Sequence, residues 1–416
     1  MTTTINNEHK KLNVPNLRFK EFQGEWSIKS INDLAKVVGG GTPDTSNKLF
    51  WDGDIQWFTP SEIGKNKYVD CSLRTISSEG LNNSSAKLLP SNTILLSSRA
   101  TIGECSISLR ECATNQGFQS LISKDCNTEF LYYLVQTKKK DLIRKSCGST
   151  FLEISANEVR KIQASIPSDA EQHKIAKLLS LLDERIATQS KVIEDLKKLK
   201  CAIIEDLYCS PKQREPKRRF LEYSSPLSSY RMKDFCERIT EKNKDNKCSL
   251  VLTIAAQDGL VDQETFFNKS VASENLTGYY ILHKGDFAYN RSYSSGYAWG
   301  AVKRLDKYED GVLSTLYICF KINETIVDSD YLSYYFESSK WHKGVSDISG
   351  EGARNHGLLN ISVTDYFDTE HRFPHIEEQK RIASMLNALT VKEQKAMELE
   401  KLYSKQKQYL LRQMFI

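Results

Sequence analysis

The feature that most limits how this chain can fold is an internal repeat. Residues 15–22 read PNLRFKEF and residues 216–223 read PKRRFLEY, so a proline, an arginine, a phenylalanine and a glutamate recur at an offset of 201. A second pair, IPSDAEQHKIAKLL from residue 166 and FPHIEEQKRIASML from residue 373, matches at an offset of 207. The sequence therefore predicts two copies of one architecture, each a variable body followed by a long terminal element. The period is too long for a solenoid.

Chain length and composition agree with two globular bodies. A chain of 416 residues exceeds the usual size of a single hydrophobic core. Its 39% hydrophobic and 27% charged residues are typical of soluble globular proteins. No segment approaches the roughly 18 apolar residues of a membrane span, and the opening MTTTINNEHKKLN lacks the apolar core of a secretory signal. We therefore expect a cytoplasmic protein.

Charge and cysteine spacing say little about ligands. The net charge of +5 is only mildly basic, and clusters such as KKKDLIRK at 138–145 either meet phosphates or form solvated faces. None of the ten cysteines forms a Cys-x-x-Cys pair. His371 and His375 have ligand-like spacing, but Pro374 interrupts any helix that would place both on one face, so we expect surface histidines. No metal or cofactor is expected in this chain.

The bodies read as mixed structure with many short strands. Apolar runs such as TILLS, SLVLTIA and LYICFKI are separated by Gly, Asn, Ser and Pro. One helix is expected to close each body, at 130–145 and 331–345, and to pack into its core. Only the first body has the segment GGGTPDTSNKLFWDGDIQWFTPSEIG, whose Trp51, Trp57 and Phe58 we assign to the core. A weaker correspondence, which requires gaps, pairs TILLSSRATIG with GDFAYNRSYSSG.

The terminal elements predict two long helices. Along residues 170–208 apolar residues recur in alternating steps of three and four, the heptad pattern of a coiled coil. At about 1.5 Å per residue this helix would be roughly 57 Å long, and residues 377–414 give a similar, less regular helix. The expected seam consists of Leu179, Leu182, Ile186, Ile193, Leu196, Ile203, Leu386, Leu389, Leu399 and Leu410.

So narrow an apolar stripe requires a partner helix, and the other helix of the same chain is available. We expect antiparallel pairing, with the two bodies at opposite ends of a rod longer than the roughly 34 Å turn of B-DNA. The alternative, each helix packing onto its own body, is disfavoured by the narrow stripe. Two diverged bodies on one frame predict the reading of two different half-sites along a duplex.

These motifs resemble one known family. The repeated P-x-x-R-F-x-E-[FY], the GGGTP segment, the SSRATIG turn and the repeated [IF]-P-x-x-x-E-Q-x-x-I-A-x-x-L occur in the order found in specificity subunits of type I restriction-modification systems. The resemblance implies an α+β chain in which two mixed α/β target-recognition domains are joined by two long antiparallel coiled-coil helices with pseudo-twofold symmetry. The expected segments are 1–165, 166–209, 210–372 and 373–416.

The resemblance also implies a function and partners. Such a subunit reads a bipartite asymmetric sequence in double-stranded DNA and recruits two modification subunits, which use S-adenosylmethionine to methylate adenine at N6. Restriction subunits, which use ATP and magnesium, join the complex. The long helices would dock the modification subunits, and two similar outer faces suit two copies of one partner.

The family does not identify individual DNA contacts, so the candidates rest on chemistry. Hydroxyls and amides on Gly-rich loops can read base edges, and Lys or Arg can bind phosphate or guanine. The alternative for each is a turn residue that satisfies backbone groups. The candidates are Thr42, Thr45, Asn47, Lys48, Ser98, Arg99 and Thr101 in the first body, and Asn290, Arg291, Tyr293, Tyr297, Arg354, Asn355 and His356 in the second.

Two other classes of function were weighed. The chain lacks the Asn/Asp-Pro-Pro-Tyr/Phe pocket of an adenine methyltransferase and any ATP-binding loop. A nuclease site starting at Pro43-Asp44 lacks a nearby Asp/Glu-x-Lys, because the next one, at Asp195 and Lys197, lies on the long helix. Catalysis would therefore come from partners. A coiled-coil adaptor that binds proteins without DNA remains the alternative, and the modest net charge permits it.

Overall fold

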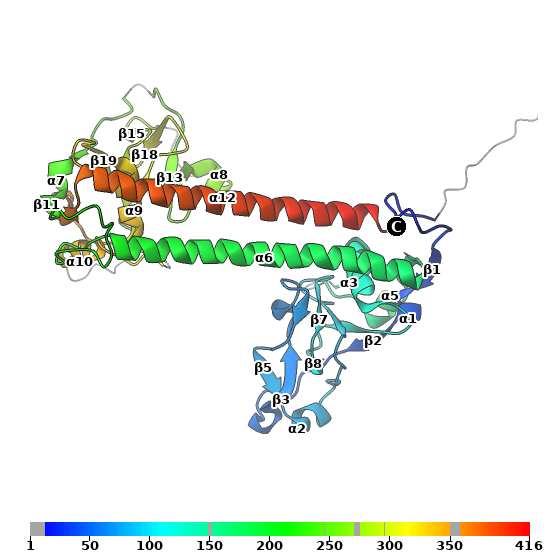
Figure 1. The fold of residues 1–416 in the computed structure, drawn as a ribbon. Coiled ribbons are helices and arrows are strands. Elements are labelled where there is room, and N and C mark those ends of the chain that lie inside the picture. Colours follow the sequence, from blue (N-terminus) through cyan, green and yellow to red (C-terminus); the bar gives the residue numbers. More distant parts are fainter. Residues whose placement is uncertain (1–12, 149–151, 245, 270–274, 295, 350–357) are drawn as a thin grey trace, which may run out of the picture. The chain divides into compact units, whose positions relative to one another are not determined.

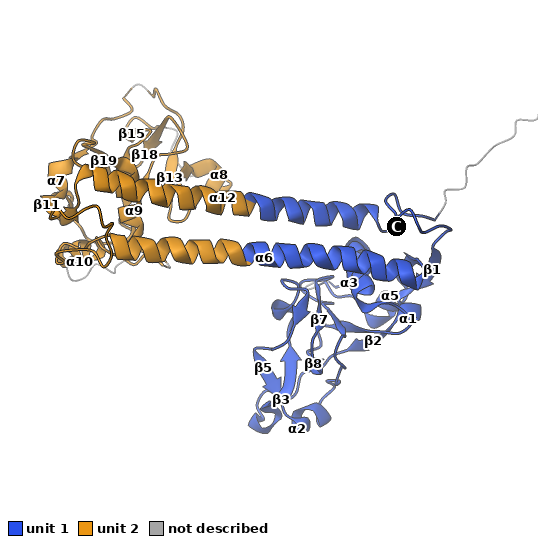
Figure 2. Cartoon of the chain, viewed as in Figure 1, with its two compact units in different colours: residues 1–190, 398–416 blue, residues 191–397 orange. Residues whose placement is uncertain are grey.

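The chain forms two compact units, and each unit contains segments from both halves of the sequence. The computed structural model describes residues 13–148, 152–244, 246–269, 275–294, 296–349 and 358–416. Unit 1 comprises residues 1–190 and 398–416, and unit 2 comprises residues 191–397 (Figure 2). The division passes through both long helices rather than between a body and its helix. Within the described ranges, no helix is long and apolar enough to cross a membrane.

Unit 1 is built on a five-stranded sheet in the order β2-β9-β6-β7-β4 (Figure 1). A three-stranded sheet, β5-β3-β8, carries the variable segment, and β1 pairs with β10. The strands are β1 Ser27–Ser30, β2 Ala35–Gly39, β3 Trp51–Phe58, β4 Tyr68–Val69, β5 Arg74–Ile76, β6 Ile94–Leu96, β7 Cys105–Ser108, β8 Cys112–Thr114, β9 Gln119–Ser123 and β10 Gln163–Ile166. The helices of the body are α1 Ile31–Leu34, η1 Lys48–Phe50, η2 Pro60–Glu62, α2 Ser78–Asn82, α3 Thr128–Thr137, α4 Lys139–Arg144 and α5 Ala156–Arg160.

Unit 2 has a four-stranded sheet in the order β12-β19-β16-β17 and three strand pairs, β11-β20, β13-β14 and β15-β18. Its strands are β11 Ser228–Arg231, β12 Cys236–Arg238, β13 Leu252–Ala255, β14 Gly259–Asp262, β15 Tyr280–His283, β16 Phe287–Asn290, β17 Ala301–Arg304, β18 Asp310–Leu313, β19 Ile318–Ile322 and β20 Glu370–Phe373. The body's helices are α7 Met232–Phe235, α8 Gln263–Phe267, α9 Ser329–Glu337, α10 His342–Ile348 and α11 Val363–Phe367.

The structure confirms that the chain repeats one framework. The run β2-β9-β6-β7 in unit 1 has the same order as β12-β19-β16-β17 in unit 2, and every neighbouring pair in both runs is antiparallel. Strands β6 and β16 occupy equivalent places, as the match of TILLSSRATIG with GDFAYNRSYSSG predicts. The additional strands differ: unit 1 adds strand β4 and the sheet β5-β3-β8, whereas unit 2 adds the strand pairs β13-β14 and β15-β18. The framework therefore repeats while the inserted parts diverge.

The two long helices lie close to their predicted positions. Helix α6 spans Asp169–Leu207 and helix α12 spans Ile376–Gln413, each without interruption (Figure 1). Within unit 1 the start of α6 packs against the end of α12, since Ile175 and Leu179 share a core with Leu410 and Met414. Within unit 2 the end of α6 meets the start of α12 through Ile204 and the residues around Leu386. Both packings require the antiparallel direction that the sequence predicted.

The predicted seam is correct except at one position. Leu179, Leu182, Ile193, Leu386 and Leu410 are buried, whereas Ile186, Leu196, Ile203 and Leu389 are half-buried. Leu399 was wrongly placed on the seam. Its side chain is 38% exposed, and the inward positions on that turn belong to Ala396, at 8%, and to half-buried Glu400. Lys200 also contributes to the seam, through an ion pair of 2.7 Å with Glu393.

The repeated sequence motifs form a repeated clamp. The Arg18 guanidinium donates two hydrogen bonds of 2.8 Å to the carboxylate of Glu171, and Arg219 does the same to Glu378 at 2.8 and 2.6 Å. The next residue, Gln172, accepts the Asn127 amide at the start of α3, and Gln379 accepts the Asp328 amide before α9. The Glu-Gln dipeptide thus joins the start of each long helix to the repeated N-terminal peptide and to the body helix.

The predicted cores are largely confirmed. Trp51, Trp57 and Phe58 are buried, and α3 contributes six consecutive buried residues, from Phe130 to Val135. Each predicted closing helix is instead divided in two, α3 with α4 and α9 with α10.

The prediction that His371 lies at the surface was wrong. Its ring is buried in strand β20, contacts the Tyr335 hydroxyl at 2.9 Å and the Thr369 hydroxyl at 2.9 Å, and burial lowers its pKa to about 3. The imidazole therefore stays neutral at ordinary pH. His375, in contrast, is exposed.

Candidate nucleic-acid interface

The Gly-rich loop of unit 1 is fixed from beneath by two indole groups. The Trp57 Nε1–H donates to the Gly41 carbonyl at 2.9 Å, and the Trp51 Nε1–H donates to the Asp44 carbonyl at 3.0 Å. A Cβ atom at Gly40 would lie 2.0 Å from the carbonyl oxygen of Asn115, so only glycine allows this approach. The loop is consequently held in one conformation while its polar side chains face outward.

Two of the predicted loops meet at a third segment that the sequence analysis did not single out. The Thr42 hydroxyl donates to Gln116 Oε1 at 2.5 Å, and the Ser98 amide donates to the Gly117 carbonyl at 2.8 Å. The turn at residues 115–117 therefore lies between the 42–48 loop and the 98–101 turn. The dipeptide Asn-Gln followed by Gly, placed between strands β8 and β9, is the turn signal that would have found it.

The individual candidates of the Gly-rich loop fall into two groups. Thr45 and Lys48 are exposed and carry polar groups that face solvent. Asn47 is half-buried, and its Oδ1 accepts the Leu49 amide at 3.0 Å, which caps η1. The carboxylate of Asp44 accepts the amide and hydroxyl of Ser46, and these hydrogen bonds lower its pKa. Thr45 and Lys48 remain available for DNA, whereas Asn47 shapes the loop.

The predicted DNA contacts on the 98–101 turn are mostly buried or bonded to other protein groups. Ser98 is buried, at 0% exposure, so its hydroxyl cannot reach a base. Arg99 is half-buried and forms an ion pair of 2.5 Å with Glu153. The Thr101 hydroxyl donates to Ser97 Oγ at 3.0 Å, although the residue itself is exposed.

Further cations surround the loop in unit 1. The exposed Arg74 stacks its guanidinium on the ring of Trp51 at 3.5 Å, the same ring that supports the Gly-rich loop. Lys87 is exposed and follows Ala86, whose amide nitrogen would lie 2.4 Å from a Cβ at Gly41. Together with Lys48 these side chains give the loop a positive border, which suits contact with phosphates.

In unit 2 the corresponding turn follows β16. The Asn290 side chain accepts the Ser292 amide at 2.9 Å, and Arg291 donates to the carbonyls of Ile361 and Leu316 at 2.9 and 3.1 Å. Both side chains thus hydrogen-bond to backbone groups, and their role as DNA contacts stays a prediction. Tyr293 is exposed, and Tyr297 is half-buried with the Lys303 ammonium 5.7 Å from its ring. The candidates Arg354, Asn355 and His356 lie outside the described residues.

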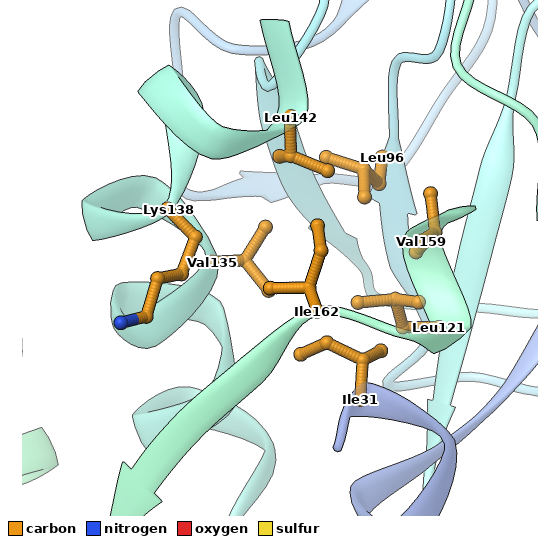
Figure 3. A pocket seen from close by; sticks show the side chains of 8 residues that line it. All are labelled: Ile31, Leu96, Leu121, Val135, Lys138, Leu142, Val159 and Ile162. Carbon is orange, nitrogen blue, oxygen red and sulfur yellow. The ribbon is translucent and has the colours of Figure 1, made fainter. Parts of the chain in front are cut away.

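The parts of the chain that the structure describes show no metal site. No group of three or more His, Cys, Asp or Glu side chains is placed there to hold a metal ion. A cavity of about 10 Å³ in the core of unit 1 is lined by aliphatic side chains such as Leu96, Leu121 and Val135 (Figure 3). It holds at most about one water molecule, so it is a packing void. Lys138 lines it with its aliphatic stem while its ammonium points away and donates to the Ile416 carbonyl.

Comparisons with known proteins agree with this arrangement. The sequence model of the family described as "Type I restriction modification DNA specificity domain" matches residues 23–198. The chain is 38% identical over 189 residues to the type I restriction enzyme MjaIX specificity subunit of Methanocaldococcus jannaschii, covering 44% of each chain. It is 30% identical over 175 residues to the EcoR124I/EcoR124II specificity subunit of Escherichia coli, covering 40% of this chain and 43% of that one. The matches therefore span less than half the length of these relatives.

Three comparisons extend over nearly the whole chain. The MjaVIII specificity subunit of Methanocaldococcus jannaschii is 22% identical over 416 residues, which covers 92% of each chain. The crystal structure of a type I restriction-modification S subunit from M. genitalium has a TM-score of 0.54 at 15% identity, covering 97% of this chain and 99% of that one. A structure from work on the assembly of a type I R-M system has a TM-score of 0.56 at 13% identity. At these identities the structures show a shared fold.

Proposed function

We propose that this chain, whose residues 23–198 match the type I restriction-modification DNA specificity family, is a specificity subunit that reads a bipartite, asymmetric DNA target. One observation carries the proposal: two bodies share a strand order, but each adds different strands and loops to it. Because a shared framework presents two different polar surfaces, the two half-sites differ in sequence. The fixed loop of unit 1, bordered by Lys48, Arg74 and Lys87, is the best-supported of these surfaces.

Catalysis belongs to partner subunits in this proposal. The family is the DNA-recognition component, and the chain's own loops bind and orient rather than react. Modification subunits, carrying S-adenosylmethionine, methylate adenine within the site that this chain selects. Restriction subunits, with ATP and magnesium, join the same complex. A pseudo-twofold repeat supports the recruitment of two copies of one modification subunit, because equivalent surfaces occur once in each half.

The test of the function is a comparison of adenine methylation in cells. Genomes are read by single-molecule sequencing from cells that carry the modification subunit with and without this chain. We expect a new two-part asymmetric motif that appears only with the chain. Exchanging residues 15–165 for those of a relative should then change one half of the motif and leave the other intact. A stable complex that yields no motif would instead favour an adaptor that binds no DNA, whose lack of salt-dependent DNA affinity provides a second check.

The docking surface for the modification subunit is best supported along α6. A groove of about 350 Å³ in unit 1 runs beside this helix and is lined by Glu129, His173, Lys177, Leu181 and Glu184 among others. The Leu181 side chain is 49% exposed at its edge, which gives the groove an apolar anchor between charged groups of both signs. Helix α12 contributes exposed Leu402 and Tyr409 to the same unit, at 60% and 52%.

Replacing Leu181 with glutamate should weaken binding of the modification subunit by at least about tenfold, because a charge would enter the apolar centre of the interface. Thr188→Glu is the matched control, since Thr188 is an exposed residue of the same helix outside the groove lining. Affinity is measured by calorimetry with the purified partner, and circular dichroism checks that both variants are folded. Equal affinities for the two variants would remove the groove from the interface.

A further inference from the structure

Gln116 lies at the tip of a turn that is fixed on every side. The Asn115 amide donates to the Phe58 carbonyl at 3.1 Å, and the Gly117 amide donates to Asn115 Oδ1 at 2.8 Å. The Gly41 amide donates to the Thr114 carbonyl at 2.8 Å, which attaches the turn to the Gly-rich loop. Gln116 itself is exposed. The backbone beneath it is therefore rigid, while its amide group faces solvent.

The side chain of Gln116 is also held. Its Oε1 accepts the Thr42 hydroxyl at 2.5 Å, and this contact joins two segments that are 74 residues apart. An exposed glutamine normally samples many rotamers, and fixing one costs entropy on binding. Here the threonine sets the direction of the amide plane in advance. The Nε2 group keeps both its donors, and Oε1 keeps one lone pair for a further acceptor contact.

We propose that Gln116, held by Thr42, reads an adenine in the half-site of unit 1. This inference rests on the proposed function. A carboxamide that offers one donor and one acceptor side by side matches the N7 acceptor and N6 donor on the major-groove edge of adenine. No other base presents that pair on its major-groove edge, so a fixed glutamine discriminates among them. The cations of Lys48 and Lys87 near the same loop hold the phosphates and bring the amide to the groove.

The neighbouring candidates are less suited to this task. Ser98 is buried, and Arg99 is engaged with Glu153. Gln119 has the same carboxamide, but its Oε1 is buried in the sheet, where no base edge reaches. Among the residues of these three converging segments, Gln116 combines exposure, a fixed direction and a two-point hydrogen-bonding group.

The test uses the full chain in complex with its modification subunit and maps the methylated motif for each variant. Gln116→Ala should relax the requirement at one base pair of one half-site, with discrimination reduced about 5- to 150-fold. Gln116→Glu should move the preference at that pair toward cytosine, whose N4 donor suits a carboxylate. Thr42→Val should weaken discrimination at the same pair by a smaller factor, because the amide stays present but loses its direction.

The controls separate the possible failures. Gln163→Ala removes an exposed glutamine from β10 of the same unit and should leave the motif unchanged. The half-site read by unit 2 serves as an internal control, since it should be intact in every variant. If the wild-type chain gives a two-part motif and Gln116→Ala gives the same one at every position, the adenine assignment is wrong. If the wild-type chain gives no motif at all, the proposed function itself fails.

Discussion

Replacing Arg219 with alanine is expected to lower the free energy of unfolding of unit 2 by about 3–5 kcal/mol. Glu378, at the start of α12, forms an ion pair with Arg219. The Glu378 side chain is only 2% exposed and the Arg219 side chain is 14% exposed. Two hydrogen bonds, at 2.8 and 2.6 Å, join the groups and raise the pKa of the arginine. Alanine would leave a buried negative charge without its partner, and that penalty accounts for most of the expected loss.

The adjacent arginine offers a matched control. Arg218 has a side chain that is 80% exposed and lies 3.3 Å from Asp206, so its removal should cost at most about 1 kcal/mol. The loss of unfolding free energy for Arg219→Lys should lie between those of the two alanine variants. Lysine keeps the positive charge but lacks the planar guanidinium that binds both carboxylate oxygens.

Stability should be followed by hydrogen exchange on peptides of each unit, since a chain with two units does not unfold in one step. Faster exchange confined to unit 2 is expected for Arg219→Ala. If Arg219→Ala lowers the free energy of unfolding no more than Arg218→Ala does, water must solvate the Glu378 carboxylate in the variant. The Arg219–Glu378 ion pair would then contribute little to stability. Arg18 and Glu171 provide the same experiment for unit 1.

Sequence reasoning succeeded where the signal is periodic or repeated. The 201 and 207 offsets predicted the repeated architecture, and the heptad pattern predicted both long helices. The contacts between the repeated arginines and glutamates were not predicted, although both residue types lie in the repeated motifs. The seam failed at Leu399 for a specific reason. Helix α12 has apolar residues on two faces, and polar Glu393 and Glu400 occupy inward positions, so hydrophobicity alone did not separate inside from outside.

The candidate site was predicted only in part, because its key contacts join distant segments. Thr42 was singled out from its Gly-rich loop, but nothing local in the sequence indicates that it contacts Gln116. Ser98 was assigned to an exposed turn, although it ends a run of consecutive buried residues that includes strand β6. His371 was assigned to the surface because Pro374 interrupts a helix that would join it to His375, whereas the structure buries it in strand β20, which pairs with β11. The contacts and the burial of these three residues depend on segments that are distant in the sequence, and a local sequence pattern does not reveal them.

The second large effect is expected from Phe415, near the end of α12. Its ring is 7% exposed and stacks on Phe130 of α3 with the ring centres 5.3 Å apart. Tyr208, its equivalent in the repeat, occupies the same place in unit 2, with its ring 4.6 Å from Tyr331. The residues that directly follow each long helix therefore complete the core of the body from the other half of the sequence. Each body lacks part of its core without the other half.

Phe415→Ala should destabilise unit 1 by about 3–5 kcal/mol and leave unit 2 unchanged, because a large cavity would open in a packed core. Tyr409→Ala is the matched control, since this aromatic side chain lies on the same helix but is 52% exposed. Hydrogen exchange should rise in α3 and β9 of the Phe415 variant and in neither for the control. Slow exchange in α3 of both variants would show that the body folds without the helix end. A rise in unit 2 as large as in unit 1 would instead mean that α12 transmits the damage along its length.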